Sequence, residues 1–509
     1  MYKLIAIIKK DRILQLILLA GLLIQLFTAI TAHGFFHPDQ HFQIIEFSSL
    51  QLHKESYAPK IWEYTSQIRP SVQVYMFSVY QLLCNAIGIT DPFNQLTLLR
   101  IIQGFIFVLA FNCMAIWYFG KGEKKVLYIV LILLNFSWFL PYSRTMFSSE
   151  ITASLLFFTS FFYFHRKAIN QTVNTKCLLL TGFLFALSFF IRFQLAFAIA
   201  GFGCWLLIEK KYQWIAYLAA GFILGVLINV ALDYGFYQEW VFTPYLYFKV
   251  NIVEGKAASF GEQGFTYYPI ALLLFLTVPP LSAVLLYYYG KISLEQFRNP
   301  LILTVLFFIT GHFLIGHKEE RFMFPAINIL PVIIGFGLPG ILSFYNSNKT
   351  WRSILRPVTI FSALLNTFLL ITIIFIPYSQ TVNFANTLNH QFKNEPTNIY
   401  CLNRTPLETE SNLPLIFYRN NSSLHYFKII TNDSLRYIQP APAWLAATYN
   451  QIKPDKKMID SLGYKPVAFS SQWLWNINTF LDEKKVNTIN DIWVLYKRKQ
   501  SVQLFIYKY

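Results

Sequence analysis

A carboxylate stands among aromatic and polar residues in the stretch HGFFHPDQHFQ (33–43), which contains three His, three Phe, one Pro and one Asp. The stretch follows directly after an apolar run that is long enough to cross a bilayer. The carboxylate of Asp39 can accept a proton from an attacking hydroxyl group, which is the role of a general base. We therefore expect a chemical site where the chain leaves the membrane, with Asp39 as its catalytic base.

Polar residues also interrupt or border the later apolar runs. The groups are His37, Asp39 and Glu46; Arg144 and Glu150; Arg192 and Gln194; Asp233; and the stretch HKEER (317–321). A charge inside a bilayer costs on the order of 2.5–3.5 kcal/mol, so such residues face one another or a wet cavity. For any single pair, a structural salt bridge or a helix cap is an equal alternative. Five groups on one side of the membrane favour a common functional site.

The side chains in these groups fit the transfer of a sugar from a lipid phosphate. Such a reaction needs a base for the acceptor hydroxyl and cations that stabilise the departing phosphate. The predicted ligands of the donor phosphate are Arg321, Lys318, His317, Arg144 and Arg192. The predicted contacts to the sugar or the acceptor are His37, Gln40, Glu46, Trp62, Asp233 and Trp240. The two Trp rings offer flat faces on which a sugar ring can stack.

The composition indicates an integral membrane protein. Of 509 residues, 55% are hydrophobic and 13% are charged, whereas about a quarter of the residues of a soluble protein are charged. The net charge of +17 does not indicate nucleic-acid binding, because the Lys and Arg residues lie in short clusters between apolar runs. Such clusters are typical of loops that orient a membrane protein. The lipid bilayer is therefore an expected partner, and nucleic acid is not.

The apolar runs predict about eleven transmembrane helices. They lie at residues 13–32, 97–119, 126–141, 147–164, 177–191, 194–208, 215–232, 268–288, 301–316, 324–343 and 357–376. The short loops rich in Lys and Arg are expected in the cytoplasm, which places the N-terminus inside and the C-terminus outside. Long outer loops are then expected at 33–96 and 233–267.

Two segments need a decision about how they meet the membrane. Residues 69–89 are apolar enough to span it, but a span there would send the basic loop GKGEKK outside. We predict instead an amphipathic helix at the outer surface. Residues 177–208 would form one helix of about 48 Å, too long for a hydrocarbon core of about 30 Å. We predict two helices, with the interruption at Arg192 and Gln194 lining a polar cavity.

The composition changes after residue 377. Apolar runs become short, and alternating stretches such as NIYCL and DIWVLYKR follow. This pattern predicts a small α/β domain at residues 378–509 on the outer face. The predicted fold is therefore an α-helical polytopic membrane module, residues 1–377, followed by a small extracytoplasmic α/β domain.

Several stretches resemble glycosyltransferase family 22, a family of polyprenol-phosphate-mannose-dependent mannosyltransferases with the GT-C fold. HPDQHFQIIE resembles the HPDE-type motif that opens the family, and HKEERFMFP resembles its HKEERF-type motif. IWEYTSQIRPSVQ (61–73), SRTMFSSE and the stretch 233–264 resemble further family blocks in the same order, the last of them closest to the branch that mannosylates the GPI core. The resemblance covers roughly residues 13–340.

The resemblance implies an inverting enzyme that takes mannose from a polyprenyl- or dolichyl-phosphate mannose and forms an α-mannoside on a glycolipid or glycan. It implies that Asp39 is the base and that Lys318 and Arg321 lie near the donor phosphate. A sugar that leaves from a lipid monophosphate needs less help from a metal than one that leaves from a diphosphate, so we expect no metal and no cofactor. The family usually has a second acid after the Asp, where this chain has Gln40.

Three alternatives remain open from the sequence. The protein could be a transporter or flippase of a lipid-linked sugar, although transporters tend to place their site at the midplane of the membrane. It could be a non-catalytic subunit, for which Gln40 is the only hint. His37, Asp39 and His41 could bind a metal. A composition rich in Ile, Lys, Asn and Phe favours a bacterial plasma membrane over the endoplasmic reticulum.

Overall fold

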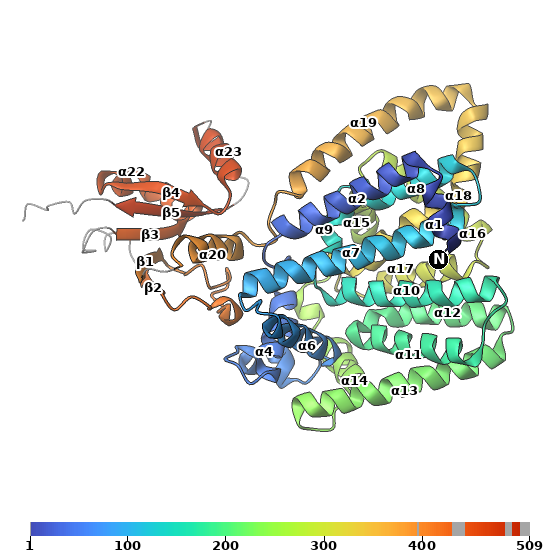
Figure 1. Ribbon diagram of the computed structural model, residues 1–509, viewed down its shortest axis with the longest axis horizontal. Coiled ribbons are helices and arrows are strands. Elements are labelled where there is room, and N and C mark those ends of the chain that lie inside the picture. Colours follow the sequence, from blue (N-terminus) through green and yellow to red (C-terminus); the bar gives the residue numbers. More distant parts are fainter. Residues whose placement is uncertain (1, 394–395, 430–442, 484–490, 499–509) are drawn as a thin grey trace, which may run out of the picture.

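The apolar runs fold into long helices that lie side by side, and a small sheet stands at one end of the bundle (Figure 1). The computed structural model describes residues 2–393, 396–429, 443–483 and 491–498. The long helices are α2 (Arg12–Thr31), α7 (Pro92–Phe119), α8 (Lys124–Phe136), α10 (Ser149–Ile169), α11 (Thr175–Ile191), α12 (Ala196–Ile208), α13 (Tyr212–Tyr237), α16 (Leu281–Glu295), α17 (Pro300–Phe313), α18 (Phe324–Ser347) and α19 (Lys349–Ile373). Shorter helices in this part are α1 (Tyr2–Lys9), α9 (Leu140–Arg144) and α15 (Tyr267–Phe275).

Polar side chains set where several of these helices begin. Asp11 accepts a hydrogen bond from the backbone N–H of Leu14 at 3.1 Å, and Asp91 accepts one from Asn94 at 3.0 Å. Pro92 then occupies the first position of α7, where its missing N–H costs nothing. Ser148 caps α10 in the same way. These caps fix the starts of the helices to single residues.

Each of the eleven predicted segments lies wholly or partly on a helix. Among the described residues, five helices are long and apolar enough to cross a bilayer alone: Arg12–Thr31, Pro92–Phe119, Tyr212–Tyr237, Glu320–Ser347 and Lys349–Ile373. The pair α16 and α17, bent by 117°, raises the number to six if it forms one span. The remaining segments form shorter or interrupted helices. The helical membrane fold is thus confirmed, while eleven crossings stay a prediction.

The segment 177–208 forms two helices, as predicted. The break falls at Arg192, whose extended backbone (φ −148°, ψ 106°) ends α11, and a single turn at Phe193–Leu195 leads into α12. Helix α11 packs closely against α13 through two Gly residues. A Cβ atom at Gly182 would lie 2.0 Å from the carbonyl oxygen of Leu218, and one at Gly221 would lie 2.1 Å from that of Leu179.

The segments 33–91 and 238–266, which belong to the loops predicted on the outer face and are called the outer segments below, form short helices around the ends of the long ones. They are α3 (Pro38–Gln40), a π-helix at His41–Glu46, α4 (Phe47–Gln51), α5 (Trp62–Thr65), α6 (Val72–Ala86) and α14 (Thr243–Phe248), which a second π-helix at Lys249–Val253 follows. Helix α6 corresponds to the predicted amphipathic helix. It buries Phe77 and Gln81 but exposes Val79 and Leu83. Its place at the membrane surface stays a prediction.

The C-terminal part forms a five-stranded mixed sheet in the order β2-β1-β3-β5-β4. The strands are β1 (Thr397–Leu402), β2 (Leu424–Ile429), β3 (Ala443–Thr448), β4 (Tyr464–Phe469) and β5 (Trp493–Arg498). The pairs β1–β2 and β1–β3 are parallel, and β3–β5 and β4–β5 are antiparallel. Helices α20 (Gln380–Gln391), α21 (Tyr449–Ile452), α22 (Lys456–Ser461) and α23 (Gln472–Glu483) accompany it. The predicted small α/β domain is confirmed.

Side chains of α20 join this domain's core. The ring of Phe384 stacks on that of Trp493 with centroids 5.6 Å apart. The turn before β2 touches the helical part, because Asn420 donates a hydrogen bond to the cap residue Asp91 at 2.9 Å. In Figure 1 the domain stands at the end of the bundle that lies opposite the N-terminus.

Candidate active site

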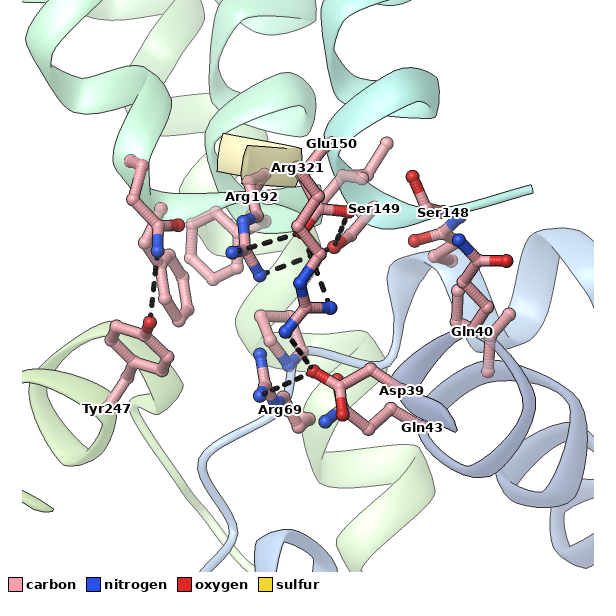
Figure 2. Close-up of a pocket in the computed structure, with 17 residues that line it drawn as sticks. Asp39, Gln40, Gln43, Arg69, Ser148, Ser149, Glu150, Arg192, Tyr247 and Arg321 are labelled. Atoms are coloured by element: carbon pink, nitrogen blue, oxygen red, sulfur yellow. Dashed lines mark hydrogen bonds and ion pairs between the residues drawn. The ribbon is translucent and has the colours of Figure 1, made fainter. Parts of the chain in front are cut away.

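Five segments that are distant in sequence bring charged side chains together at this end of the bundle (Figure 2). Their positions follow from local structure. Pro38 opens α3 with His37 as its cap, which places Asp39 in the first turn. Ser148 caps α10 and leaves Glu150 in its first turn. Arg192 lies at the break between α11 and α12, and Arg321 lies in a 3₁₀ turn at Glu320–Met323 just before α18.

Arg321 lies at the centre of the group and contacts three carboxylates. Its Nη2 donates to Oδ2 of Asp39 at 2.8 Å, and its Nε donates to Oε2 of Glu319. Its Nη1 lies 3.6 Å from Oε1 of Glu150. The same oxygen of Glu150 lies 3.1 Å from Nη2 of Arg192. The four side chains therefore form a continuous row from Asp39 through Arg321 and Glu150 to Arg192, as Figure 2 shows.

A second cation, Arg69, approaches Asp39 from the outer segment 61–71. Its Nη2 lies 3.9 Å from Oδ2 of Asp39 and 3.8 Å from Oε1 of Glu63. Its guanidinium also lies over the ring of Tyr247, 5.7 Å from the centroid. The sequence did not single out Arg69, Glu63 or Tyr247. The available signal was weak, since Arg69 only precedes a Pro within a stretch that resembles a family block.

The charges of the site act on one another. Burial works to raise the pKa of Asp39, but Arg321, the hydrogen bond with His37 and the charge of Arg69 outweigh it and hold that pKa well below its ordinary value. Burial also works to raise the pKa of Glu319, but the hydrogen bond with Arg321 and the charge of Arg321 outweigh burial and lower that pKa to about 2. Asp39 is therefore ionised at neutral pH and able to accept a proton.

The row borders two adjoining cavities. The smaller has a volume of about 30 Å³, room for about one water molecule, and it contacts Gln40, Ser149 and Glu150. The larger has a volume of about 1070 Å³. Residues that line both are Asp39, Arg69, Arg192, Phe193, Gln194, Tyr247 and Arg321. A sugar and part of a lipid would fit the larger cavity.

The lining of the larger cavity is mixed in character. It includes polar and charged side chains, among them Glu63, Asn251 and His317, together with the ring of Trp62. It also includes apolar side chains, which are Phe189, Phe193, Ala196, Phe197, Phe248, Ile252 and Leu314. A cavity with both kinds of lining suits a ligand with a polar head and a hydrocarbon tail.

Most of the predicted site residues line these cavities. The larger cavity takes His37, Asp39, Trp62, Arg192, His317, Lys318 and Arg321, and the smaller takes Gln40. Lys318 is partly committed already, because its Nζ donates to the backbone carbonyl of Gln263 at 3.0 Å and to that of Ile315 at 2.5 Å. Nε2 of His317 lies 3.0 Å from Oε1 of Glu319.

Arg144 and Glu46 do not line either cavity. Arg144 is buried among the helices, where its Nη1 donates to the carbonyl of Leu134 at 2.7 Å and its Nε donates to Asn328 at 2.9 Å. Glu46 is fully buried, and its Oε1 lies 3.1 Å from Nε2 of His41. It also accepts backbone N–H groups of Tyr57 at 2.9 Å and Phe417 at 3.2 Å. Both side chains therefore hydrogen-bond to other groups of the fold and do not face a cavity.

Asp233 and Trp240 also lie outside both cavities. Asp233 accepts the backbone N–H and the hydroxyl of Ser71, both at 2.7 Å, and the hydroxyl of Thr243 at 2.8 Å. It therefore ties α13 to two outer segments. Trp240 is 74% exposed and stacks on Tyr234 with centroids 4.4 Å apart. The sequence indicated Asp233 by its charge and Trp240 by its ring, both near a helix end. In the structure Asp233 binds groups of the fold, and Trp240 packs on a ring at the surface.

The three residues of the alternative metal site do not converge. His41 is buried against Glu46, and its ring stacks between Phe35 and Tyr418. Among the residues that the structure describes, no group of three or more His, Cys, Asp or Glu side chains is arranged to hold a metal ion.

Comparisons with known proteins place the sequence among glycosyltransferases. Residues 16–407 match the model of the Alg9-like mannosyltransferase family. "GPI mannosyltransferase 3" of Candida albicans is 27% identical over 319 residues, which cover 61% of this chain and 60% of that protein. "GPI alpha-1,2-mannosyltransferase 3" of Bos taurus is 20% identical over 452 residues, which cover 86% of this chain and 76% of that protein. The match to the Candida albicans protein thus spans less than two thirds of its length.

Among solved structures, ArnT from Cupriavidus metallidurans bound to undecaprenyl phosphate aligns with a TM-score of 0.48 and 11% identity. The alignment covers 96% of this chain and 98% of that one.

Proposed function

The chain belongs to the Alg9-like mannosyltransferase family, and we infer that it transfers mannose from a polyprenyl- or dolichyl-phosphate mannose to a glycolipid or glycan acceptor. The reaction takes place at the outer face of the membrane and forms an α-mannoside. The names of the relatives make a GPI-like glycolipid the first acceptor to test.

Asp39 acts as the general base in this proposal. Its carboxylate takes the proton of an acceptor hydroxyl, and the oxygen attacks the anomeric carbon on the face opposite the phosphate. The bond between that carbon and the phosphate oxygen breaks as the new glycosidic bond forms, so the configuration inverts. The lipid phosphate leaves with the bonding electrons, and cations of the site stabilise its growing charge.

One observation carries the proposal: the ionised carboxylate of Asp39 borders a cavity of about 1070 Å³ whose lining includes both charged and apolar side chains. The polar side chains suit a sugar, with Trp62 as a stacking surface. The apolar side chains suit a polyprenyl tail. A permease for a free sugar would have no need of these apolar side chains beside the charged row.

The test uses the full-length protein in proteoliposomes with synthetic polyprenyl-phosphate mannose and a glycolipid acceptor. We expect a mannosylated product that α-mannosidase cleaves. Movement of intact donor across the membrane without a new product would indicate a flippase instead. If neither product nor movement appeared, the protein would be a non-catalytic member of the family.

We further propose the plasma membrane of a bacterium as the location. Its support is the composition rich in Ile, Lys, Asn and Phe. In a eukaryotic cell the same orientation would place the site in the lumen of the endoplasmic reticulum. Fractionation of native membranes with an antibody to the chain tests the location.

A further inference from the structure

Arg321 and Arg192 lie in one row, yet their surroundings differ. Arg321 contacts Asp39, Glu319 and Glu150, so three negative charges face one positive charge. Arg192 contacts only one carboxylate of the row, Glu150, which it shares with Arg321. The Nε atom of Arg192 is buried and has no hydrogen-bond partner among the described residues. Arg192 therefore has a spare donor, while Arg321 is surrounded by acceptors.

An anion would be bound unequally at the two positions. A phosphate that approached Arg321 would meet the like charges of Asp39 and Glu319 at close range, which is unfavourable in a site with little water. Arg192 meets one carboxylate, Glu150, in place of three. Phe189, Phe193, Ala196 and Phe197, which flank Arg192 in the chain, line the larger cavity with it. A phosphate at Arg192 would leave its lipid tail against these apolar side chains.

The geometry of an inverting displacement leads to the same division. The base and the leaving phosphate must lie on opposite sides of the anomeric carbon, because the attacking and leaving oxygens are in line. A cation that donates directly to the base at 2.8 Å lies on the base's side. Arg192 lies beyond Arg321 and Glu150 in the row, away from Asp39 (Figure 2). It is the cation of the row that is separated from the base.

We propose that Arg192 binds the phosphate of the lipid donor and that Arg321 is a positioning residue, which holds the carboxylate of Asp39 in place. This assignment rests on the proposed function. It changes the prediction from the sequence, in which both residues bind phosphate.

Binding of the leaving group alone tests whether Arg192 binds the phosphate. The probe is a short-chain polyprenyl phosphate without sugar, titrated against the full-length protein in nanodiscs. Arg192→Gln should weaken its binding roughly 10- to 100-fold, the effect of losing a charge-assisted hydrogen bond. Arg321→Gln should leave the affinity nearly unchanged. Arg298→Gln, which changes an exposed residue outside both cavities, is the matched control. Weaker binding in Arg321→Gln with normal binding in Arg192→Gln would overturn the assignment.

The pH dependence of mannose transfer tests whether Arg321 positions Asp39. Groups that face the Asp39–Arg321 pair are His37 from the same loop, Arg69 and Glu63 from the segment 61–71, Glu150 from α10 and Glu319 from the turn before α18. Loss of Arg321 removes the charge that favours the ionised form of Asp39. The acid limb of the rate profile should therefore move to higher pH in Arg321→Gln and stay in place in Arg192→Gln. The same shift should appear in a His37→Gln background, which excludes His37 as its source.

Two outcomes separate this assignment from the proposed function. If the wild-type protein makes no mannoside, the function fails, while the binding result still decides where phosphate sits. If it makes mannoside and the acid limb does not move in Arg321→Gln, the positioning role fails alone. Should Arg321→Gln not fold, Arg321→Lys tests the positioning role in another way. One ammonium group keeps the charge, so the acid limb should stay in place, but it cannot bridge three carboxylates, so kcat should fall while binding of the polyprenyl phosphate stays close to that of the wild type.

Discussion

The guanidinium of Arg321 donates a hydrogen bond to the carboxylate of Asp39 at 2.8 Å, although the two residues are 282 positions apart in the chain. Asp39 follows the first long helix, and Arg321 precedes α18. The bond joins the two stretches whose residue types first indicated a phosphate-dependent reaction. The hydrogen bond therefore joins opposite ends of the helical part of the chain.

This site should make the protein sensitive to acid. The pKa of Glu319 is about 2 in the folded protein and about 4.3 in an unfolded chain. A lowered pKa stabilises the fold above the unfolded value, and this contribution is lost as the pH falls through the folded value. The difference in Tm between the wild type and Glu319→Gln should be largest near pH 6 and narrow by pH 3. A difference that stayed constant over this range would show that Glu319 is not ionised against Arg321.

Glu46 should couple the C-terminal domain to the outer segment. It is fully buried and accepts N–H groups from Tyr57 and Phe417. In Glu46→Gln one carboxylate oxygen becomes an NH₂ group, so that a donor faces the backbone N–H of Tyr57 or of Phe417 and this N–H loses its acceptor. We expect a loss of about 1–3 kcal/mol in stability and faster hydrogen exchange in the turn Ile416–Tyr418. Glu123→Gln, which changes an exposed carboxylate just before α8, should change neither. Unchanged exchange in Glu46→Gln would mean that the domain is held by other contacts.

The long helices, and the two segments whose residues Asp39 and Arg321 meet in the structure, could be recognised from the sequence because each depends on a local pattern. Apolar runs mark long helices, and the polar interruption at Arg192 marks the break between α11 and α12. Whether a polar residue at a helix end binds a ligand or an N–H group of the fold depends on distant partners. Glu46 and Asp233 bind such N–H groups, and their sequence context does not differ from that of Asp39. Arg69 was missed for the same reason, since its partners Asp39 and Tyr247 lie far from it in the chain.

Gln40→Glu should be tolerated. Oε1 of Gln40 accepts the backbone N–H of Phe36 at 3.1 Å, and a carboxylate oxygen can accept it equally well. The change also restores the acid that the family usually has. We expect kcat for mannose transfer to stay within a factor of ten, which corresponds to less than about 1.4 kcal/mol in the barrier. A loss comparable to that of Asp39→Asn would show that the second position must be neutral in this chain.

Thiol labelling tests the orientation in the membrane. Single Cys residues are placed at exposed positions in a Cys-free background and treated from outside with an impermeant reagent. Positions 54 and 256 should be labelled, and positions 124 and 210 should be labelled only after the membrane is opened. Labelling of position 210 in closed vesicles would contradict the two-helix interpretation of 177–208 as a hairpin that returns to the cytoplasm.

The most direct test of the account compares mannose transfer and donor-phosphate binding in Asp39→Asn. The substitution keeps the shape of the side chain and removes its basicity, so kcat should fall by a factor of about 10²–10⁴ while binding of polyprenyl phosphate stays close to that of the wild type. Asp460→Asn, the same chemical change at an exposed residue of the sheet domain, should transfer mannose normally. Wild-type transfer rates in a folded Asp39→Asn protein would contradict the role of Asp39 as the base.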